Sequence, residues 1–99
     1  MASSTITKFS SVRYESGTTG QLSTAANAYS SYSVTFGTAF KSAPHVQLTI
    51  KSSFGSVANA HALVACIYGN PSTTGFNLRV YNNGSSTLTP EVYWLAVGE

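Results

Sequence analysis

Apolar and polar residues alternate with a period of two along most of the chain. The clearest case is 31–36, where Ser, Ser and Thr alternate with Tyr, Val and Phe. This pattern is typical of a β-strand that buries one face and exposes the other. The same alternation predicts further strands at 45–51, 76–81 and 91–97 and, more weakly, at 6–14.

The run 60–68 is apolar on both of its alternating faces. It predicts either a central strand covered on both sides or a strand whose second face meets a partner chain. Cys66 lies within this run, so we interpret it as a small buried apolar residue rather than a reactive thiol. Because it is the single cysteine of the chain, no internal disulfide can form.

Residues that favour turns separate these segments. Gly, Pro, Asn and Ser gather at 16–20, 42–44, 52–56, 69–72 and 82–85. Asn83-Gly84 predicts a β-hairpin, because both residues tolerate positive φ. The helix-like stretch 22–28 is too short to form more than a turn. Six short strands without a helical period predict one all-β domain, either a sandwich or a small barrel.

Charge is scarce and hydroxyl groups are abundant. Charged residues make up 8% of the chain, against about 25% in an average soluble domain. Asp is absent, the carboxylate side chains are Glu15, Glu91 and Glu99, and Ser and Thr occupy 28 positions. The shortage of carboxylates, together with the absence of a nucleophile motif, argues against an enzyme. The five cations are scattered, which argues against nucleic-acid binding.

The hydropathy of the chain predicts neither a membrane span nor a Sec-type signal peptide, and it suggests association. No stretch approaches the ~20 apolar residues of a membrane span, and the N-terminus carries no Sec-type signal peptide. A domain of about 100 residues buries only about two-thirds of its unfolded surface. The two-faced run at 60–68 and an aromatic content of 12% indicate more apolar surface than one small core can hide. The sequence therefore predicts a homo-oligomer.

Two histidines, His45 and His61, are the candidate metal ligands. They lie on different predicted strands without a neighbouring Asp, so one chain does not supply the three or four ligands of a metal site. A three-fold axis could gather one histidine from each of three chains. An ordinary surface or interface histidine is the simpler interpretation, and we expect no metal and no cofactor.

Five segments occur in a characteristic order: 16–20 (SGTTG), 32–36 (YSVTF) followed by Phe40, 43–48 (APHVQL), 72–83 (STTGFNLRVYNN) and 92–98 (VYWLAVG). Their order and spacing resemble the H-type lectin-like domains of bacteriophage tail-fibre tips and prophage structural proteins. The resemblance implies a six-stranded antiparallel β-sandwich over 16–99 that trimerises about a three-fold axis and recognises a glycan or receptor. Residues 1–15 would form an N-terminal arm that docks on other virion proteins.

Arg79 is the first candidate for ligand binding, because it lies on the polar face of its strand beside Asn77 and Tyr81. Its planar fork of donors suits polyols or carboxylates. The resemblance supports this choice, since a strand Arg near this place helps animal H-type lectins to bind sugar. Two alternatives are a hydrogen bond between subunits and a pair with Glu91.

Tyr93 and Trp94 complete the candidate ligand-binding set. Trp94 shares a face with Val92 and Ala96, so the alternative for it is a core anchor. Animal H-type lectins also use an acidic acceptor for sugar hydroxyls, and this chain has no Asp. Recognition of galactose in the animal manner is therefore not expected.

The resulting hypothesis is a non-enzymatic bacteriophage or prophage virion protein. It would be made in the bacterial cytoplasm, be exposed on the particle as a fibre tip or decoration, trimerise, and bind host-surface glycans. Two alternatives remain open: a free-standing lectin unrelated to a virion, and a purely structural decoration protein with no ligand. Fold alone does not choose among them.

Overall fold

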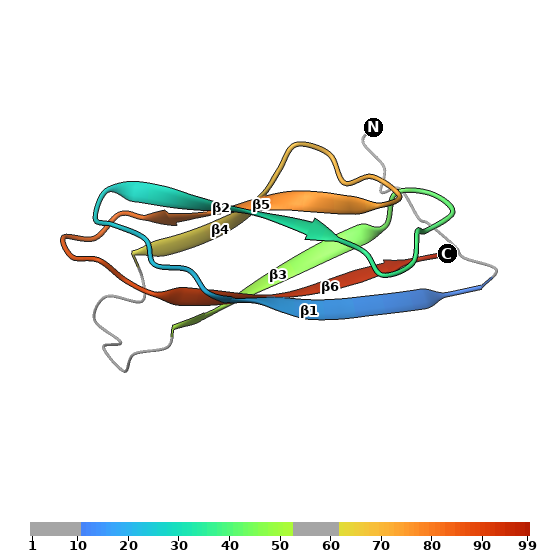
Figure 1. Ribbon diagram of the computed structural model, residues 1–99, viewed down its shortest axis with the longest axis horizontal. Helices are drawn as coiled ribbons and strands as arrows, with labels where there is room; N and C mark the ends of the chain where they lie inside the picture. Colours follow the sequence, from blue (N-terminus) through green and yellow to red (C-terminus); the bar gives the residue numbers. More distant parts are fainter. Residues whose placement is uncertain (1–10, 53–61) are drawn as a thin grey trace, which may run out of the picture.

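Six β-strands in two stacked sheets make up the part of the chain described by the computed structural model, residues 11–52 and 62–99 (Figure 1). The strands are β1 (Arg13–Gln21), β2 (Ala28–Thr35), β3 (His45–Ser52), β4 (Leu63–Tyr68), β5 (Gly75–Asn82) and β6 (Pro90–Gly98). One sheet has the order β1-β6-β3 and the other β2-β5-β4, with antiparallel pairing throughout. The all-β prediction is confirmed.

β5 and β6 are the central strands, and each turns alternate residues toward the opposite sheet. The inward rows are Phe76, Leu78 and Val80 on β5 and Val92, Trp94 and Ala96 on β6, all with an exposed fraction of 8% or less. These are the apolar positions of the predicted alternation. The period of two therefore located the core-facing residues of both central strands.

Four aromatic rings fill one part of the core: Phe36, Phe40, Phe76 and Trp94. Neighbouring rings have centroids 5.0 to 5.9 Å apart, within the range of favourable tilted and edge-to-face packing. Trp94 comes from β6 and is 8% exposed. Of its two interpretations, core anchor and ligand-binding residue, the structure supports the core anchor. Phe40 also lies under the guanidinium of Arg13, whose Cζ is 3.7 Å from the ring centroid.

The apolar run at 60–68 is not a central strand. β4 stands at the edge of its sheet, paired only with β5 among the described residues. Val64, Cys66 and Tyr68 point outward and are exposed, whereas Leu63 is buried in the core. The interpretation of Cys66 as a buried residue is wrong, because its alternation places it on the outer face of a two-layer structure.

Asn83-Gly84 does not form a hairpin between its flanking strands. β5 and β6 lie in different sheets, so the connection after Asn82 crosses from one layer to the other. Asn82 is fully buried and holds this crossing: its Nδ2 donates to the carbonyls of Thr24 and Ser86, each at 2.9 Å, and its Oδ1 accepts from the Gly84 N–H at 2.9 Å. Turn propensity is local, whereas the choice of sheet depends on the whole core.

The stretch 22–28 contains no helix; Thr24 forms an isolated antiparallel bridge with Leu88, and a turn follows. Asn27 in that turn has a φ of 55°, a conformation that Asn adopts more readily than most residues. No helix in the described residues is long and apolar enough to cross a membrane.

The first strand begins earlier than the boundary expected between arm and domain. Residues 13–15 pair with β6, and Glu15 Oε2 accepts a hydrogen bond of 2.8 Å from the Gly37 N–H. They therefore form the start of β1. The turn predicted at 16–20 is wrong, because these residues continue β1. The part of the weak strand prediction that covers 6–10 lies outside the described ranges, and so does His61.

Candidate functional site

The outward surface of the β2-β5-β4 sheet gathers three of the five predicted site residues. We call it the Arg79 face. Strand registry arranges its side chains in three rows across β2, β5 and β4: Tyr29, Tyr81 and Val64; Ser31, Arg79 and Cys66; Ser33, Asn77 and Tyr68. Arg79 therefore occupies the middle of the middle row, because β5 is the central strand.

Two tyrosines from the edge strands hold the Arg79 guanidinium. Its Cζ lies 3.8 Å from the ring centroid of Tyr68 and 4.5 Å from that of Tyr29. Such distances allow a cation–π attraction with each ring. Its Nη1 is 3.5 Å from the hydroxyl of Tyr81, at the limit of a hydrogen bond. This contact with Tyr81 is the largest cause that raises the pKa of Arg79 above its ordinary value, so the residue stays charged.

The guanidinium has unused hydrogen-bonding capacity. Its Nε is buried without a hydrogen-bond partner, and no carboxylate within residues 11–52 and 62–99 forms an ion pair with it. The Nη groups remain the donors that can meet a ligand. The face thus carries a fixed positive charge without a counter-charge from the described chain.

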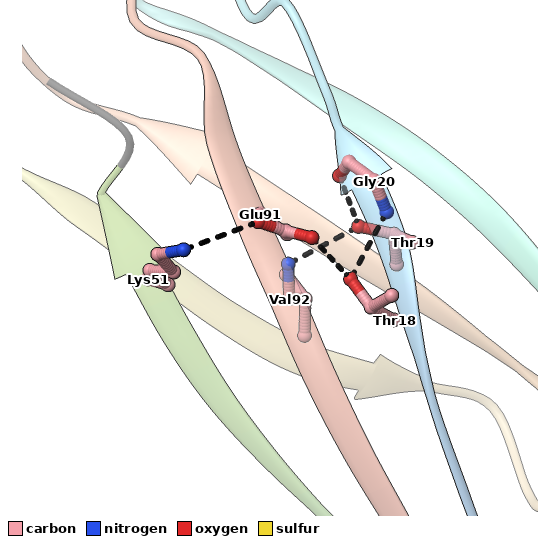
Figure 2. A network of polar contacts seen from close by, with 6 residues as sticks. All are labelled: Thr18, Thr19, Gly20, Lys51, Glu91 and Val92. Atoms are coloured by element: carbon pink, nitrogen blue, oxygen red, sulfur yellow. Dashed lines mark hydrogen bonds and ion pairs between the residues drawn. The ribbon is translucent and has the colours of Figure 1, made fainter.

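Glu91, one of the partners considered for Arg79, lies in the other sheet. Figure 2 shows its carboxylate among β1, β3 and β6: Oε2 accepts a 2.6 Å hydrogen bond from Thr18 Oγ1, and Oε1 is 3.9 Å from Lys51 Nζ. Thr19 Oγ1 accepts a further hydrogen bond of 3.1 Å from the Val92 N–H. These contacts secure β1 where its pairing shifts between Thr18 and Gln21. The predicted alternative of an Arg79–Glu91 pair is therefore wrong.

A hollow of about 270 Å³ opens beside the third row of the Arg79 face. Its lining combines the ends of β2 and β5 with the loop before β5 and is mainly hydroxyl and amide: Ser33, Val34, Thr35, Asn70, Ser72, Thr74, Gly75, Phe76 and Asn77. Ser33 donates a 2.7 Å hydrogen bond to Asn77 Oδ1, which leaves the Asn77 amide N–H groups as donors. Ser72 fixes the rim, because its Oγ accepts from the N–H groups of Thr74 and Gly75, each at 3.2 Å.

The five predicted site residues do not form one site. Asn77, Arg79 and Tyr81 share the Arg79 face, Trp94 is in the core, and Tyr93 lies on the outer face of the other sheet. There Tyr93 is 5.8 Å by its ring centroid from Lys51 Nζ and raises the pKa of Lys51 above its ordinary value. Tyr93 and Trp94 lie on opposite faces because neighbouring side chains of a strand, here β6, point in opposite directions.

Sequence reasoning missed Tyr29 and Tyr68, the two residues that hold Arg79. The sequence predicts Tyr68 in a strand that is either covered on both sides or meets a partner chain with one face, and nothing in its own segment shows that Arg79 lies beside it. The alternation supplied a partial signal: once Leu63 faces the core, Tyr68 five positions later must face outward.

The described residues contain no group of three or more His, Cys, Asp and Glu side chains that could hold a metal ion. His45 lies exposed at the start of β3. The aligned donors of the Arg79 face are a guanidinium, an amide and hydroxyl groups. This set suits oxygen-rich organic ligands rather than metal ions.

The sequence matches no protein-family model and no curated protein. Solved structures do match its fold. A fibre of the R1 pyocin of P. aeruginosa, comprising residues 323–701, aligns with a TM-score of 0.64 at 20% identity, over 89% of this chain and 23% of the fibre chain. An N-truncated R1-type pyocin tail fibre aligns with the same score and identity over 89% of this chain and 70% of its own.

A phage protein shares the same arrangement. The tailspike of Pseudomonas phage phi297 aligns with a TM-score of 0.63 at 15% identity, over 87% of this chain and 15% of the tailspike. The chain thus spans less than a quarter of the longer fibre and of the tailspike that it matches. Its two antiparallel sheets form a fold that pyocin tail fibres and a phage tailspike contain as one part of a longer chain.

Proposed function

We propose that this chain is a non-enzymatic virion protein of a phage or phage-like particle, exposed on its surface, that binds host-surface glycans. The observation that carries the proposal is the shared fold with pyocin tail fibres and a phage tailspike over 87% to 89% of this chain. The resemblance of its segments to H-type lectin-like domains adds the expectation of glycan recognition. The Arg79 face supplies a surface with the chemistry for it.

A homotrimer is part of this proposal. Large apolar side chains remain exposed on the outer face of the β1-β6-β3 sheet of the single chain, among them Tyr14 and Tyr93. A monomer would leave this surface in water. Sedimentation velocity or mass photometry at micromolar concentration should show trimers, and a purely monomeric species would contradict the assembly.

Residues 1–15 are proposed to contribute to docking on the particle. Thr5, Ile6, Thr7 and Phe9 form a β-prone sequence, and such segments often add to the sheet of a neighbouring protein. Deletion of 1–12 should leave the trimer intact and abolish incorporation into the particle, because β1 begins after the deleted segment. Dissociation of the trimer would show instead that the segment belongs to the core.

Glycan binding is tested with the purified trimer on an array of bacterial surface saccharides. Arg79→Ala should abolish the signal, and Lys51→Ala, which removes the same charge from the opposite sheet, should retain it. Images of the protein on its parent particle provide the second measurement. Particle incorporation without any glycan signal would favour a purely structural decoration, whereas glycan binding without a particle would favour a free-standing lectin.

A further inference from the structure

The carboxylates of the described chain lie on one side of the sandwich, away from the Arg79 face. All three glutamates belong to the β1-β6-β3 sheet or its end, and each has a partner there: Glu15 with Gly37 and Arg13, Glu91 with Thr18 and Lys51, and Glu99 with the Ser11 N–H. The Arg79 face carries a guanidinium and no described carboxylate. It is electrostatically complementary to an anion.

The tyrosines also restrict which part of Arg79 a ligand can reach. Tyr68 and Tyr29 lie against the guanidinium, and the Nε is buried. The Nη groups therefore form the accessible edge. A planar fork held in this way matches the two oxygens of a carboxylate better than a single hydroxyl, because two parallel charge-assisted hydrogen bonds can form.

The hollow lies beside Arg79 along β5, because Asn77 lines it. Asn77 and Arg79 are two positions apart on the same face of β5, which places their Cα atoms about 7 Å apart. The amide of Asn77 and the hydroxyls of Ser33, Ser72 and Thr74 can donate to and accept from sugar hydroxyls. Tyr68, opposite Asn77 in the third row, offers part of its ring as an apolar wall, since it is 51% exposed.

A second copy of the chain is a poorer occupant of this particular surface. Contact between two Arg79 faces would remove their guanidinium groups from water without a described carboxylate to pair with them. Contact with the β1-β6-β3 sheet of another copy would meet Glu91, whose carboxylate already has Thr18 and Lys51 as partners. Burial of an unpaired charge is strongly unfavourable. An anionic partner removes that cost and uses the donors that the single chain leaves open.

We infer that the Arg79 face selects saccharides that carry a carboxylate, such as uronic acids. Arg79 binds the carboxylate, Asn77 and the hollow bind the neighbouring hydroxyls, and Tyr68 packs against the sugar ring. This inference rests on the proposed glycan-binding function and names the chemical class of its ligand. The inference also accounts for the absence of Asp, the acidic acceptor expected in a lectin of this kind. Here the protein supplies the positive partner, and the sugar supplies the negative one.

The decisive experiment compares matched ligands on the unmodified protein. Isothermal titration with glucuronic acid oligosaccharides, with the same oligosaccharides after reduction of their carboxyl groups, and with phosphorylated glucose oligosaccharides separates the three chemistries. We expect at least tenfold tighter binding of the carboxylated form than of the other two. Equal binding of reduced and carboxylated forms overturns the inference but leaves glycan binding in place. Preference for the phosphorylated form also overturns the inference, because the face would then select phosphate rather than carboxylate.

Two variants assign the site within the protein. Arg79→Ala should remove the preference for the carboxylate, and Arg79→Lys should restore only part of it, because a lysine keeps the charge but lacks the fork. Lys51→Ala should bind as the unmodified protein does. Loss of the trimer in Arg79→Ala would mean that the face is a subunit interface and would overturn the inference. Absence of binding to every saccharide by the unmodified trimer would reject the proposed function itself.

Discussion

The indole of Trp94 lies over Gly17, its direct partner across the β1–β6 ladder. A Cβ added to Gly17 would stand 2.8 Å from Cζ2 and 3.0 Å from Cε2 of Trp94. The indole has little room to shift, because the rings of Phe36 and Phe76 also pack against it with centroids 5.9 and 5.6 Å away. Gly17 thus provides the space that the largest side chain of the core needs beside β1.

We expect Gly17→Ala to destabilise the domain by about 1–3 kcal/mol, the usual cost of forcing an extra carbon into a packed core. Chemical denaturation followed by Trp94 fluorescence measures this change directly. Gly37→Ala is the matched control, since its added Cβ would meet only Glu15 Oε2 at 3.8 Å. Equal stability of the two variants would show that the indole can move away from β1.

Gly75 is constrained by backbone rather than by a side chain. A Cβ there would overlap the Val34 carbonyl oxygen, at the end of the β2–β5 ladder. Because the carbonyl cannot rotate away without breaking the ladder, Gly75→Ala should cost about 3 kcal/mol or more, at or above the upper end for overpacking. It should also distort the rim of the hollow, so saccharide binding should weaken even at temperatures where the variant remains folded.

Asn82 holds the crossing between the sheets through three hydrogen bonds of 2.9 Å. Asn82→Ala should destabilise the domain by about 2 kcal/mol or more, since it removes three hydrogen bonds in a buried region. The Gly84 N–H loses this partner, and the Thr24 carbonyl keeps the Leu88 N–H at 3.0 Å. Asn83→Ala, which changes the exposed neighbour, is the control and should have little effect. Thermal unfolding compares the two, and similar midpoints would contradict the assigned role.

Cys66 stands directly opposite Arg79 in the β4–β5 ladder and is exposed. It should react with a maleimide in the native protein without denaturant, and a uronic acid oligosaccharide bound at Arg79 should slow the reaction. Mass spectrometry measures the labelled fraction over time. A thiol that reacts only after unfolding would place a partner chain over this face.

The pH dependence of binding should come from the ligand. Tyr81 raises the pKa of Arg79, so the guanidinium remains charged throughout the physiological range. A uronic acid carboxylate resembles an α-carboxyl group, with an ordinary pKa of about 3.5, and the nearby cation lowers it further in the complex. Affinity should therefore be constant from about pH 5 to pH 7 and fall only as the pH drops through the carboxyl pKa. Titration calorimetry at several pH values tests this expectation, and a loss of affinity above pH 5 would contradict it.

Part of the candidate site could be predicted from the sequence. The alternation around Arg79 placed Asn77, Arg79 and Tyr81 on one outward face, because residues two apart in a strand share a face. It could not supply Tyr29 or Tyr68, which reach Arg79 from separate strands. Nor could it exclude a pair between Arg79 and Glu91. The two residues lie in different sheets, and which strands share a sheet depends on strand pairing rather than on the local pattern.

The sequence by itself determined the strands from β2 onward and the inward residues of β5 and β6, because a period of two and the turn residues between segments are local properties that each segment carries. It did not determine β1, since the turn predicted at 16–20 lies inside that strand. Tertiary structure decided which strands share a sheet. It placed the apolar run containing Cys66 at an edge, made Asn83-Gly84 a crossing instead of a hairpin, and brought Tyr68 against Arg79. These outcomes depend on contacts between residues far apart in the chain, which minimise the exposure of the whole core and which no single segment specifies.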